Sequence, residues 1–182
     1  MIYKKIITLK DGRECILRNG TGDDAEGVLS VFIATHEQTD FLTTYTDEMP
    51  ITVDEEREFL DKCTEDERGI EMIAKIDGKV VGNAGIGCIK NVDKLRHRAS
   101  FGISIDKDYW GLGIGRGLTS ACIECAKKAG YTQLELEAVA DNETALSLYR
   151  SAGFVEYGRN PKGFKSRISG WQELVLMRLD LE

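Results

Sequence analysis

The chain has 182 residues, of which 42% are hydrophobic and 30% charged, and its 24 basic and 31 acidic side chains give a formal net charge of −7. This composition is ordinary for a folded domain and argues against disorder, and no apolar run reaches the roughly 18–20 residues of a membrane-spanning helix. The acidic balance also disfavours general nucleic-acid binding. We therefore expect a single domain over residues 1–182, without membrane or nucleic-acid partners.

The cysteines favour a reducing compartment. There are five, scattered at positions 15, 63, 88, 122 and 125, in a chain too long to need disulfides. The first seven residues contain too short an apolar stretch for a secretory signal. We expect a cytoplasmic protein with reduced thiols and no metal site, because the chain has only two histidines and a single C-x-x-C pair.

The first third of the chain is expected to form a hairpin and two helices. Alternating polarity predicts strands at 2–9 and 14–18. Capping-box patterns then predict the starts of two helices on either side of an irregular stretch at 36–50: Thr21 with Asp24, and Thr52 with Glu55.

Strands and helices alternate in the rest of the chain. Asp77-Gly78 is a strong turn signal and predicts a hairpin of 70–76 and 79–89, with bulges or close backbone approach at its glycines. The later elements follow from apolar periodicity and from glycines that end helices: a strand at 99–105, a helix at 113–129, a strand at 134–139, a helix capped by Asp141 or Asn142, and strands at 154–158 and 172–179.

This order predicts an α/β fold with a mixed, mostly antiparallel central sheet flanked by about four helices. A parallel pair of strands is expected around the helix at 113–129, because a strand–helix–strand unit returns the chain in the same direction. No linker or internal repeat interrupts the pattern.

Glycines at 111, 113, 115 and 117 lie between a predicted strand and a predicted helix. They allow a tight turn whose N–H groups point one way, and the start of the helix adds the positive end of its dipole. Together these features predict a pyrophosphate-binding loop. A glycine-rich turn that binds nothing is the alternative, but four alternating glycines exceed what a turn requires.

Two common nucleotide-binding motifs do not match this chain, because residues that they require are absent. The dinucleotide fingerprint G-x-G-x-x-G meets Arg116 when it starts at Gly111 and Leu118 when it starts at Gly113. A P-loop requires Gly-Lys-Ser/Thr, which follows none of these glycines. A nucleotide-binding protein is therefore the weakest of the alternatives.

The glycine cluster reads Trp110-Gly111-Leu112-Gly113-Ile114-Gly115, and a later run reads Asn142-Glu143-Thr144-Ala145-Leu146-Ser147-Leu148-Tyr149-Arg150-Ser151-Ala152-Gly153-Phe154. The first resembles the Arg/Gln-x-x-Gly-x-Gly/Ala signature of the GNAT superfamily of N-acetyltransferases, with Trp110 in place of Arg or Gln. The second resembles that family's N-x-x-A-x-x-L-Y-x-x-x-G-F run. The hydrophobic pattern matches from about residue 14 to 180, so the resemblance covers nearly the whole chain.

The resemblance implies a sheet whose parallel pair splays to admit acetyl-CoA as co-substrate. It implies that the backbone of Ile103 and Ile105 pairs with the pantetheine arm, which Asn142 also contacts. The pyrophosphate would be held by backbone N–H groups at the start of the helix: Gly111, Gly113, Gly115 and Arg116.

Tyr149, by the same resemblance, lies near the sulfur and is the expected catalytic acid. A phenol suits the protonation of a leaving thiolate, because its reference pKa of ~10 lies above the ~8.5 of a thiol. The alternative is a core aromatic, since residues 145, 148, 149 and 152 form an apolar stripe. The oxyanion would be stabilised by a backbone N–H near Ile103.

No general base is assigned from the sequence. Ser100 stands where many relatives that acetylate protein N-termini carry a glutamate, and a serine cannot act as a base alone. The other carboxylates on predicted strands are Glu71, Glu135 and Glu137, and we expect each to be a solvated strand residue rather than a catalyst.

The acceptor is an amine of undetermined identity. Residues 47–67 carry a local charge of −8, which is interpreted either as steering of a cationic amine or as a solvated helix face. Basic side chains cluster at 90–98 and at 159–167, and we expect them in solvated loops. The alternative is that one cluster contacts the 3′-phosphate of CoA or an anionic partner.

We expect an N-acetyltransferase that moves an acetyl group from acetyl-CoA by direct attack of a primary amine in a ternary complex. The acceptor would be a small cationic amine or a protein N-terminus. The alternative is an acyl-CoA-binding sensor or scaffold of the same fold, which the departures at Trp110 and Ser100 keep open. The sequence allows a homodimer but does not fix the oligomeric state.

Overall fold

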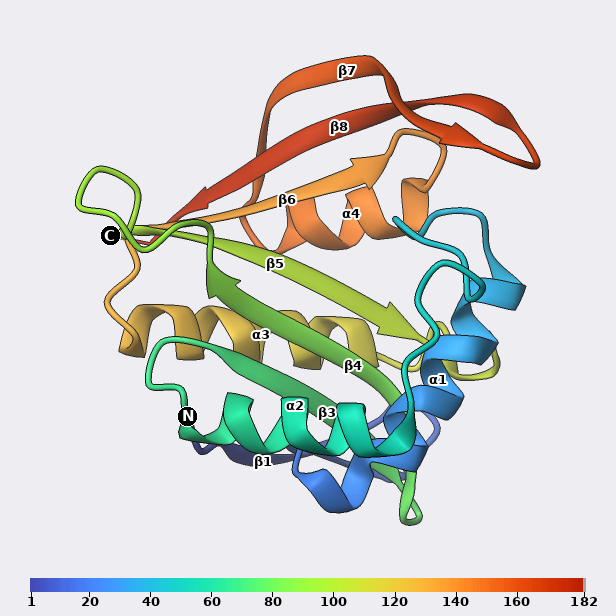
Figure 1. Cartoon of the computed structure of the whole chain (residues 1–182), viewed down its shortest axis with the longest axis vertical. Coiled ribbons are helices and arrows are strands. Elements are labelled where there is room, and N and C mark those ends of the chain that lie inside the picture. The colour runs from blue at the N-terminus through green and yellow to red at the C-terminus, as the bar shows by residue number, and fades with distance from the viewer. Residues whose placement is uncertain (182) are drawn as a thin grey trace.

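The computed structural model describes residues 1–181 and contains an eight-stranded sheet of order β1-β2-β3-β4-β5-β6-β8-β7 (Figure 1). Its strands are β1 (Lys4–Thr8), β2 (Glu14–Asn19), β3 (Ile70–Ile76), β4 (Lys79–Cys88), β5 (Arg98–Ile105), β6 (Gln133–Val139), β7 (Val155–Ser166) and β8 (Gly170–Asp180). The helices are α1 (Ala25–Gln38), α2 (Val53–Glu65), α3 (Ile114–Lys128) and α4 (Glu143–Ser151), with short 3-10 turns η1 (Gly22–Asp24) and η2 (Lys107–Tyr109). The predicted class, a mixed and mostly antiparallel sheet with four helices, is confirmed.

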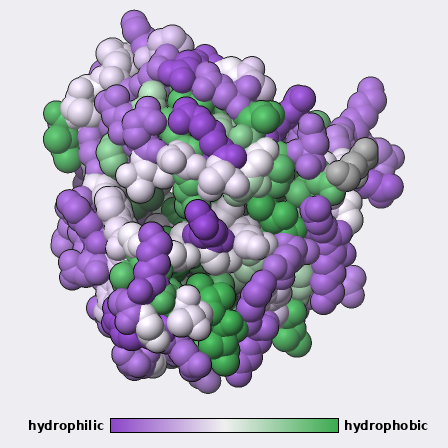
Figure 2. All heavy atoms as spheres, turned by 180° about the vertical axis from the view of Figure 1, so that it is seen from behind, coloured by the Kyte–Doolittle hydropathy of each residue, from purple (hydrophilic) through white to green (hydrophobic). Residues whose placement is uncertain are grey.

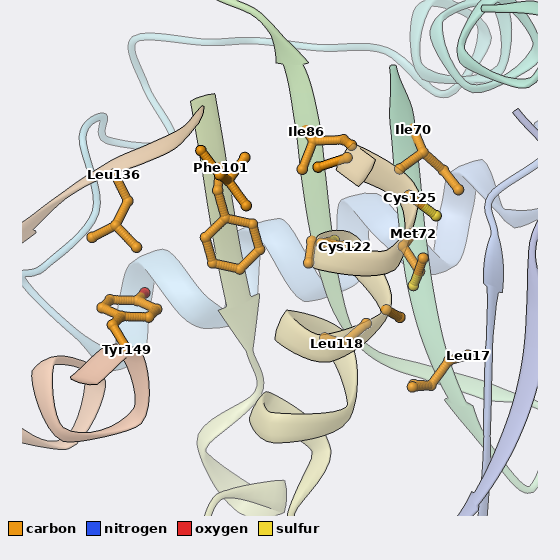
Figure 3. Close-up of a cluster of buried hydrophobic side chains, with 14 of the residues drawn as sticks. Leu17, Ile70, Met72, Ile86, Phe101, Leu118, Cys122, Cys125, Leu136 and Tyr149 are labelled. Atoms are coloured by element: carbon orange, nitrogen blue, oxygen red, sulfur yellow. The ribbon is translucent and has the colours of Figure 1, made fainter. Parts of the chain in front are cut away.

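Helices pack on both faces of the sheet. On one face, Leu118 of α3 packs in the same apolar cluster as Met72 of β3 (Figure 3). On the other face, Leu60 of α2 packs with Ile73 of β3 and with α1. Both leucines are 0% exposed, and burial of such a side chain contributes about 1.5–3 kcal/mol. Within residues 1–181, no helix combines the length and the apolar content needed to cross a membrane.

The face of the molecule turned away from the viewer in Figure 1 is largely polar. Figure 2 shows the molecule from behind, where hydrophilic side chains cover most of the face and apolar patches are small and scattered.

The five cysteines are all free thiols, as expected, and Cys15, Cys122 and Cys125 are buried. The buried thiols belong to the apolar core between the sheet and α3.

Both predicted capping boxes form. Thr52 Oγ1 accepts a hydrogen bond from the N–H of Glu55 at 3.2 Å, and Glu55 Oε2 accepts one from the N–H of Thr52 at 2.8 Å, so α2 begins where the sequence predicts. Thr21 and Asp24 cap the η1 turn, from which α1 continues. The carboxylate of Asp24 also accepts from the Arg18 side chain of β2 at 2.7 Å, which ties this turn to the sheet.

The parallel pair expected around the helix at 113–129 consists of β5 and β6. The two strands pair only over three positions, Arg98–Ser100 with Gln133–Glu135. Beyond these residues β5 stays paired with β4, and β6 with β8. From Phe101 onward, one edge of β5 therefore has no neighbouring strand among residues 1–181.

The C-terminal hairpin differs from the prediction. The sequence predicts a strand only at 154–158, whereas β7 continues to Ser166 and pairs with β8 along the edge of the sheet. Pro161 lies within a stretch where the register shifts, and an edge strand tolerates its missing N–H. The expectation of a loop for the basic side chains at 159–165 was therefore wrong.

Candidate active site

A cavity of about 960 Å³ opens where β5 and β6 diverge. Its walls come from the second half of β5, the glycine loop, the start of α3, the end of β6, and α4. Every residue that the sequence predicts for the site lies in this lining: Ile103, Ile105, Gly111, Gly113, Gly115, Arg116, Asn142 and Tyr149.

The glycine loop has the backbone conformation that only glycine adopts easily. Gly111 and Gly113 have φ of 77° and 102°, and Gly113 is the N-cap of α3. The first N–H groups of a helix have no acceptor within the helix, so those of α3 face the cavity without an intrahelical partner. This geometry suits an anionic ligand.

The other two glycines of the cluster serve packing. A Cβ on Gly117 would lie 2.6 Å from the Ile7 side chain, and a Cβ on Gly115 would lie 3.1 Å from Leu148. Gly117 therefore lets α3 approach β1, and Gly115 lets it approach α4. The sequence argument attributes all four glycines to a ligand, whereas two of them are needed for close approach of elements.

A hydrogen bond from Trp110 holds the glycine loop against the end of β5. Its Nε1–H donates to the carbonyl oxygen of Ile105 at 2.8 Å, and the carbonyl of Leu112 accepts from the N–H of Lys10 at 3.1 Å. The resemblance assigns pantetheine pairing to the backbone of both Ile103 and Ile105. Since the Ile105 carbonyl already has a donor, Ile103 offers the freer backbone.

Charges around the cavity are unevenly distributed. Three cationic side chains line it, Lys5, Lys10 and Arg116, and Arg116 belongs to the first turn of α3. Glu137 is the one carboxylate in its lining among the described residues. The end that holds the glycine loop is therefore the favourable place for phosphate groups.

Tyr149 of α4 is buried beneath the point where β5 and β6 separate. Its ring lies 6.1 Å from that of Phe101, edge-on, and 6.0 Å from that of Phe154 (Figure 3). Burial raises the pKa of Tyr149 to about 12. The hydroxyl therefore stays protonated at neutral pH and can act as a proton donor.

Asn142 has a structural role as well as a place in the cavity. It is the N-cap of α4, and its Oδ1 accepts from the N–H of Ala145 at 3.2 Å. Its amide nitrogen donates to no group among residues 1–181, so it is available to a ligand. Of the two capping residues considered, Asn142 rather than Asp141 is the cap.

The segment after α1 closes the cavity from the face of the sheet opposite α3. Hydrogen bonds join this segment to the β7–β8 hairpin. Asp40 Oδ2 accepts from Ser166 Oγ at 2.6 Å, Ser169 Oγ at 2.8 Å and Gln172 Nε2 at 3.2 Å. Next to it, Phe41 and Leu42 line the cavity, as Phe164 of β7 does. Sequence reasoning missed Asp40, since its partners lie more than 120 residues away.

The strand carboxylates are in three different environments. Glu135 is 12% exposed and forms a two-pronged ion pair with Arg98, while Glu137 lines the cavity. Glu71 accepts from Asn83 Nδ2 at 2.7 Å, and burial raises its pKa to about 7. The prediction of solvated side chains was therefore wrong for Glu71 and Glu135.

The acidic segment lies away from the cavity. Asp54 pairs with Arg57, Glu58 pairs with Lys62, and Asp61 Oδ1 accepts from the N–H of Gly22 at 2.8 Å. None of the acidic side chains of α2 belongs to the cavity lining. The contacts of Asp54, Glu58 and Asp61 are those of a solvated helix face, whereas Glu56 is buried, with 7% of its surface exposed.

The described part of the chain has no group of three or more His, Cys, Asp or Glu side chains placed to bind a metal. Cys122 and Cys125 both point into the apolar core from α3 (Figure 3). Burial raises the pKa of Cys125 to about 11, so its thiol remains protonated. The cavity lining contains hydroxyls, the Asn142 amide, three cationic side chains and one carboxylate.

Comparison with known proteins gives a family match. The sequence model of the acetyltransferase (GNAT) family matches residues 31–154. The L-amino acid N-acyltransferase MnaT of Escherichia coli K12 is 28% identical over 111 residues, 61% of this chain and 64% of that protein. The N-alpha-acetyltransferase RimI of Mycobacterium tuberculosis is 33% identical over 105 residues, 58% of this chain and 63% of that protein. The chain thus spans less than two thirds of either relative.

Solved structures agree over a larger share. An acetyltransferase of the GNAT family from Streptococcus pneumoniae superposes with a TM-score of 0.86 at 27% identity, over 91% of this chain and 99% of that one. The yncA structure from Salmonella typhimurium, described with its cofactor acetyl-CoA, has a TM-score of 0.80 at 19% identity, over 92% and 94% of the two chains. The likeness at 19% identity concerns the fold alone.

Proposed function

The chain belongs to the GNAT family of acetyltransferases, and from this premise we propose that it transfers the acetyl group of acetyl-CoA to a primary amine. One observation carries the proposal. A single cavity joins the free N–H groups at the start of α3 to the unpaired edge of β5. A molecule with a pyrophosphate at one end and a long amide-containing arm at the other matches those two features.

The proposed cofactor placement follows the lining. The pyrophosphate would accept from the backbone N–H groups of Gly111, Gly113, Gly115 and Arg116, with Lys10 nearby. The pantetheine amides would pair with the free edge of β5 at Ile103 and with the amide group of Asn142. The Ile105 carbonyl already accepts a hydrogen bond from Trp110 and keeps one lone pair for this pairing.

The proposed chemistry is direct attack. The amine nitrogen forms a bond to the thioester carbonyl carbon, the carbon–sulfur bond breaks, the sulfur takes the proton of Tyr149, and the surplus proton of the nitrogen replaces it on Tyr149. Burial raises the pKa of this phenol to about 12, so it stays protonated until the thiolate forms. Transfer to a thiolate of reference pKa ~8.5 is uphill by itself, and it is completed as the proton from the nitrogen replaces the one that Tyr149 gives up. A backbone N–H near Ile103 would stabilise the oxyanion.

We propose an acceptor amine that has no carboxylate beside it. On the side of the cavity closed by the segment after α1, the lining consists of hydroxyls, apolar side chains and Glu137. The other residues are Thr35, Thr39, Phe41, Leu42, Thr43, Ser104 and Phe164. The cations of the lining belong to β1, the turn after it and the start of α3. Burying a carboxylate without a cationic partner would be costly, whereas an ammonium group suits this side.

The test is the release of free thiol from acetyl-CoA with matched pairs of amines. Each pair consists of an amino acid and its carboxamide, with simple alkylamines as a further set. We expect a kcat/KM at least about tenfold higher for the carboxamide, which corresponds to about 1.4 kcal/mol. Faster reaction with the free amino acid would contradict the proposed acceptor class, and no release with any amine would contradict the transfer reaction.

An acyl-CoA-binding module without transferase activity is the second candidate. It is favoured by Ser100, whose hydroxyl donates only to the Gly87 carbonyl at 3.3 Å and so supplies no base on β5. Saturable acetyl-CoA binding together with the absence of thiol release across all amines would support it.

A further inference from the structure

Four residues form a row across the centre of the sheet, on the face that α3 does not cover. Glu71 of β3 is opposite Gly85 of β4, and Gly85 is opposite Gly102 of β5. The parallel register places Ser100 beside Glu135, so two residues further on Gly102 lies level with Glu137, where the strands have begun to separate. Two carboxylates therefore flank two adjacent glycines.

Because the two glycines have no side chains, the sheet surface between these carboxylates is uncovered, and we call this part of the surface the floor. A Cβ built on Gly102 would meet nothing within 4 Å, so the space above it is open. A Cβ on Gly85 would collide with Oε2 of Glu71, which means that this carboxylate oxygen lies directly above Gly85. Figure 1 shows α2 in front of β3, while the middle of β4 and β5 has no helix in front of it. The carboxylate of Glu71 thus projects from beneath α2 over this floor.

Hydrogen bonds fix the orientation of Glu71. Its Oε1 accepts from Asn83 Nδ2 at 2.7 Å, and Asn83 Oδ1 accepts in turn from Ser104 Oγ at 2.7 Å. Ser104 lines the cavity. Oε2 accepts no hydrogen bond from residues 1–181 and remains available. The three side chains connect β3, β4 and β5 to the cavity in one rigid line.

We infer that Glu71 is the carboxylate that receives the proton of the acceptor amine, through water held above Gly85 and Gly102. Neighbouring strands lie about 4.8 Å apart, so Gly102 is roughly 10 Å from Glu71 along the row, a gap for water to fill. An amide cannot relay a proton, so Asn83 acts as a positioning residue. The inference rests on the proposed transfer reaction.

The proton balance is complete without a further reactant. The ammonium group of the acceptor loses one proton to water, and the water passes a proton to Oε2 of Glu71. The amine lone pair forms the bond to carbon, the carbon–sulfur bond breaks, and Tyr149 protonates sulfur. The second proton of the nitrogen restores Tyr149, and Glu71 returns its proton to solvent.

The surroundings of Glu71 suit a base that titrates near neutrality. From α2, Glu56 and Cys63 face it, and from α3, Cys122 lies beneath the sheet. Burial raises the pKa of Glu71 to about 7, Asn83 opposes the rise, and the charge of Glu56 adds to it. No cationic side chain of residues 1–181 forms an ion pair with it, in contrast to Glu135. A carboxyl with this pKa is ionised often enough to accept a proton at neutral pH.

The test compares Glu71→Gln with Glu137→Gln, its counterpart at the other end of the row. In the unchanged chain, kcat/KM for the amine should rise with pH through about 7, and we call this rise the limb of the pH profile. Glu71→Gln should lower kcat/KM by about 100-fold at pH 7 and abolish this limb, leaving a rate that follows the free amine. Glu137→Gln should raise KM for a cationic amine but keep the limb. Acetyl-CoA affinity should stay within about twofold in both.

A second variant protects the test against a folding defect. Asn83→Ala removes the hydrogen bond that lowers the pKa of Glu71, so the limb should move to higher pH. Three results would each overturn the assignment of Glu71 as the proton acceptor while leaving the transfer reaction intact. These are a limb that does not move in Asn83→Ala, a limb that is retained in Glu71→Gln, and a limb that is lost in Glu137→Gln. Absence of thiol release in the unchanged chain would instead overturn the transfer reaction itself.

Discussion

Tyr149 is the residue on which the proposed leaving-group chemistry depends. Its ring is fixed by Phe101 and Phe154, and burial raises its pKa to about 12. Tyr149→Phe should lower kcat by about 100-fold, because the proton donor is lost. The affinity for acetyl-CoA should remain within about twofold, since the ring and its contacts are unchanged. Steady-state kinetics and calorimetric titration measure the two quantities.

Tyr157 provides the matched control for this substitution. It lies on β7 with 49% of its surface exposed and does not belong to the cavity lining. Tyr157→Phe should leave both kcat and acetyl-CoA affinity unchanged. Equal activity of Tyr149→Phe and the unchanged chain would show that sulfur is protonated by another group.

Local motifs located the residues whose positions depend on one element. Tyr149 and Asn142 belong to the same short helix, so their spacing could be predicted from sequence, and both line the cavity. The environment of Glu71 could not be predicted, because it depends on Asn83 of the next strand and on α2 lying above. Trp110 is similar, since its donation to Ile105 is a property of the folded loop.

At the scale of elements, the junction of the glycine loop and α3 is the proposed phosphate site. Gly113 has φ of 102° and is the N-cap of the helix. Alanine in this region of φ costs roughly 1–2 kcal/mol and displaces the first N–H groups of α3. Gly113→Ala should therefore weaken acetyl-CoA binding by at least about tenfold, or about 1.4 kcal/mol, as measured by calorimetry.

The opposite end of the same helix offers the control. Gly130 follows α3 with φ of 77°, and a Cβ there would meet nothing within 4 Å, as at Gly113. Gly130→Ala should lower the melting temperature to a similar extent but leave acetyl-CoA affinity unchanged. Equal affinities of the two variants would contradict a phosphate site at the start of α3.

Most elements could be predicted because their signals are local. Both capping boxes and the Asp77-Gly78 turn lie where expected, and β5, α3 and β6 form the predicted parallel unit. The long β7 could not be predicted, because its pairing with β8 continues past Pro161 through a shift in register. Gly117 shows the same limitation, since its need for space comes from Ile7 of β1.

At the scale of the whole molecule, the sheet separates two kinds of surface around one cavity. Arg116 and the first N–H groups of α3 lie beside the glycine loop. Glu137 lines the cavity, whereas Glu71 lies outside its lining, two strands from Gly102 on the face that α3 does not cover. The net charge of −7 does not describe either region. Asp54 and Glu58 of α2 take part in local pairs outside the cavity and would act on a cationic amine only at long range, whereas the buried Glu56 acts on Glu71.

Hydrogen bonds hold the segment after α1 against the β7–β8 hairpin. Asp40 joins three side chains of this hairpin, so the wall that carries Phe41 and Phe164 is a single unit. Residues more than 120 positions apart in the sequence thus form together the wall that we propose for the acceptor. The cofactor side, by contrast, is built mainly from the continuous stretch between β5 and α4.

A calorimetric titration of the chain with acetyl-CoA, with NAD titrated in parallel, tests the assignment of the cavity. We predict saturable binding of one acetyl-CoA per chain, in the micromolar range or tighter, and no measurable binding of NAD. Absence of acetyl-CoA binding would contradict the assignment of the cavity between β5 and β6, and of the glycine loop, to this co-substrate.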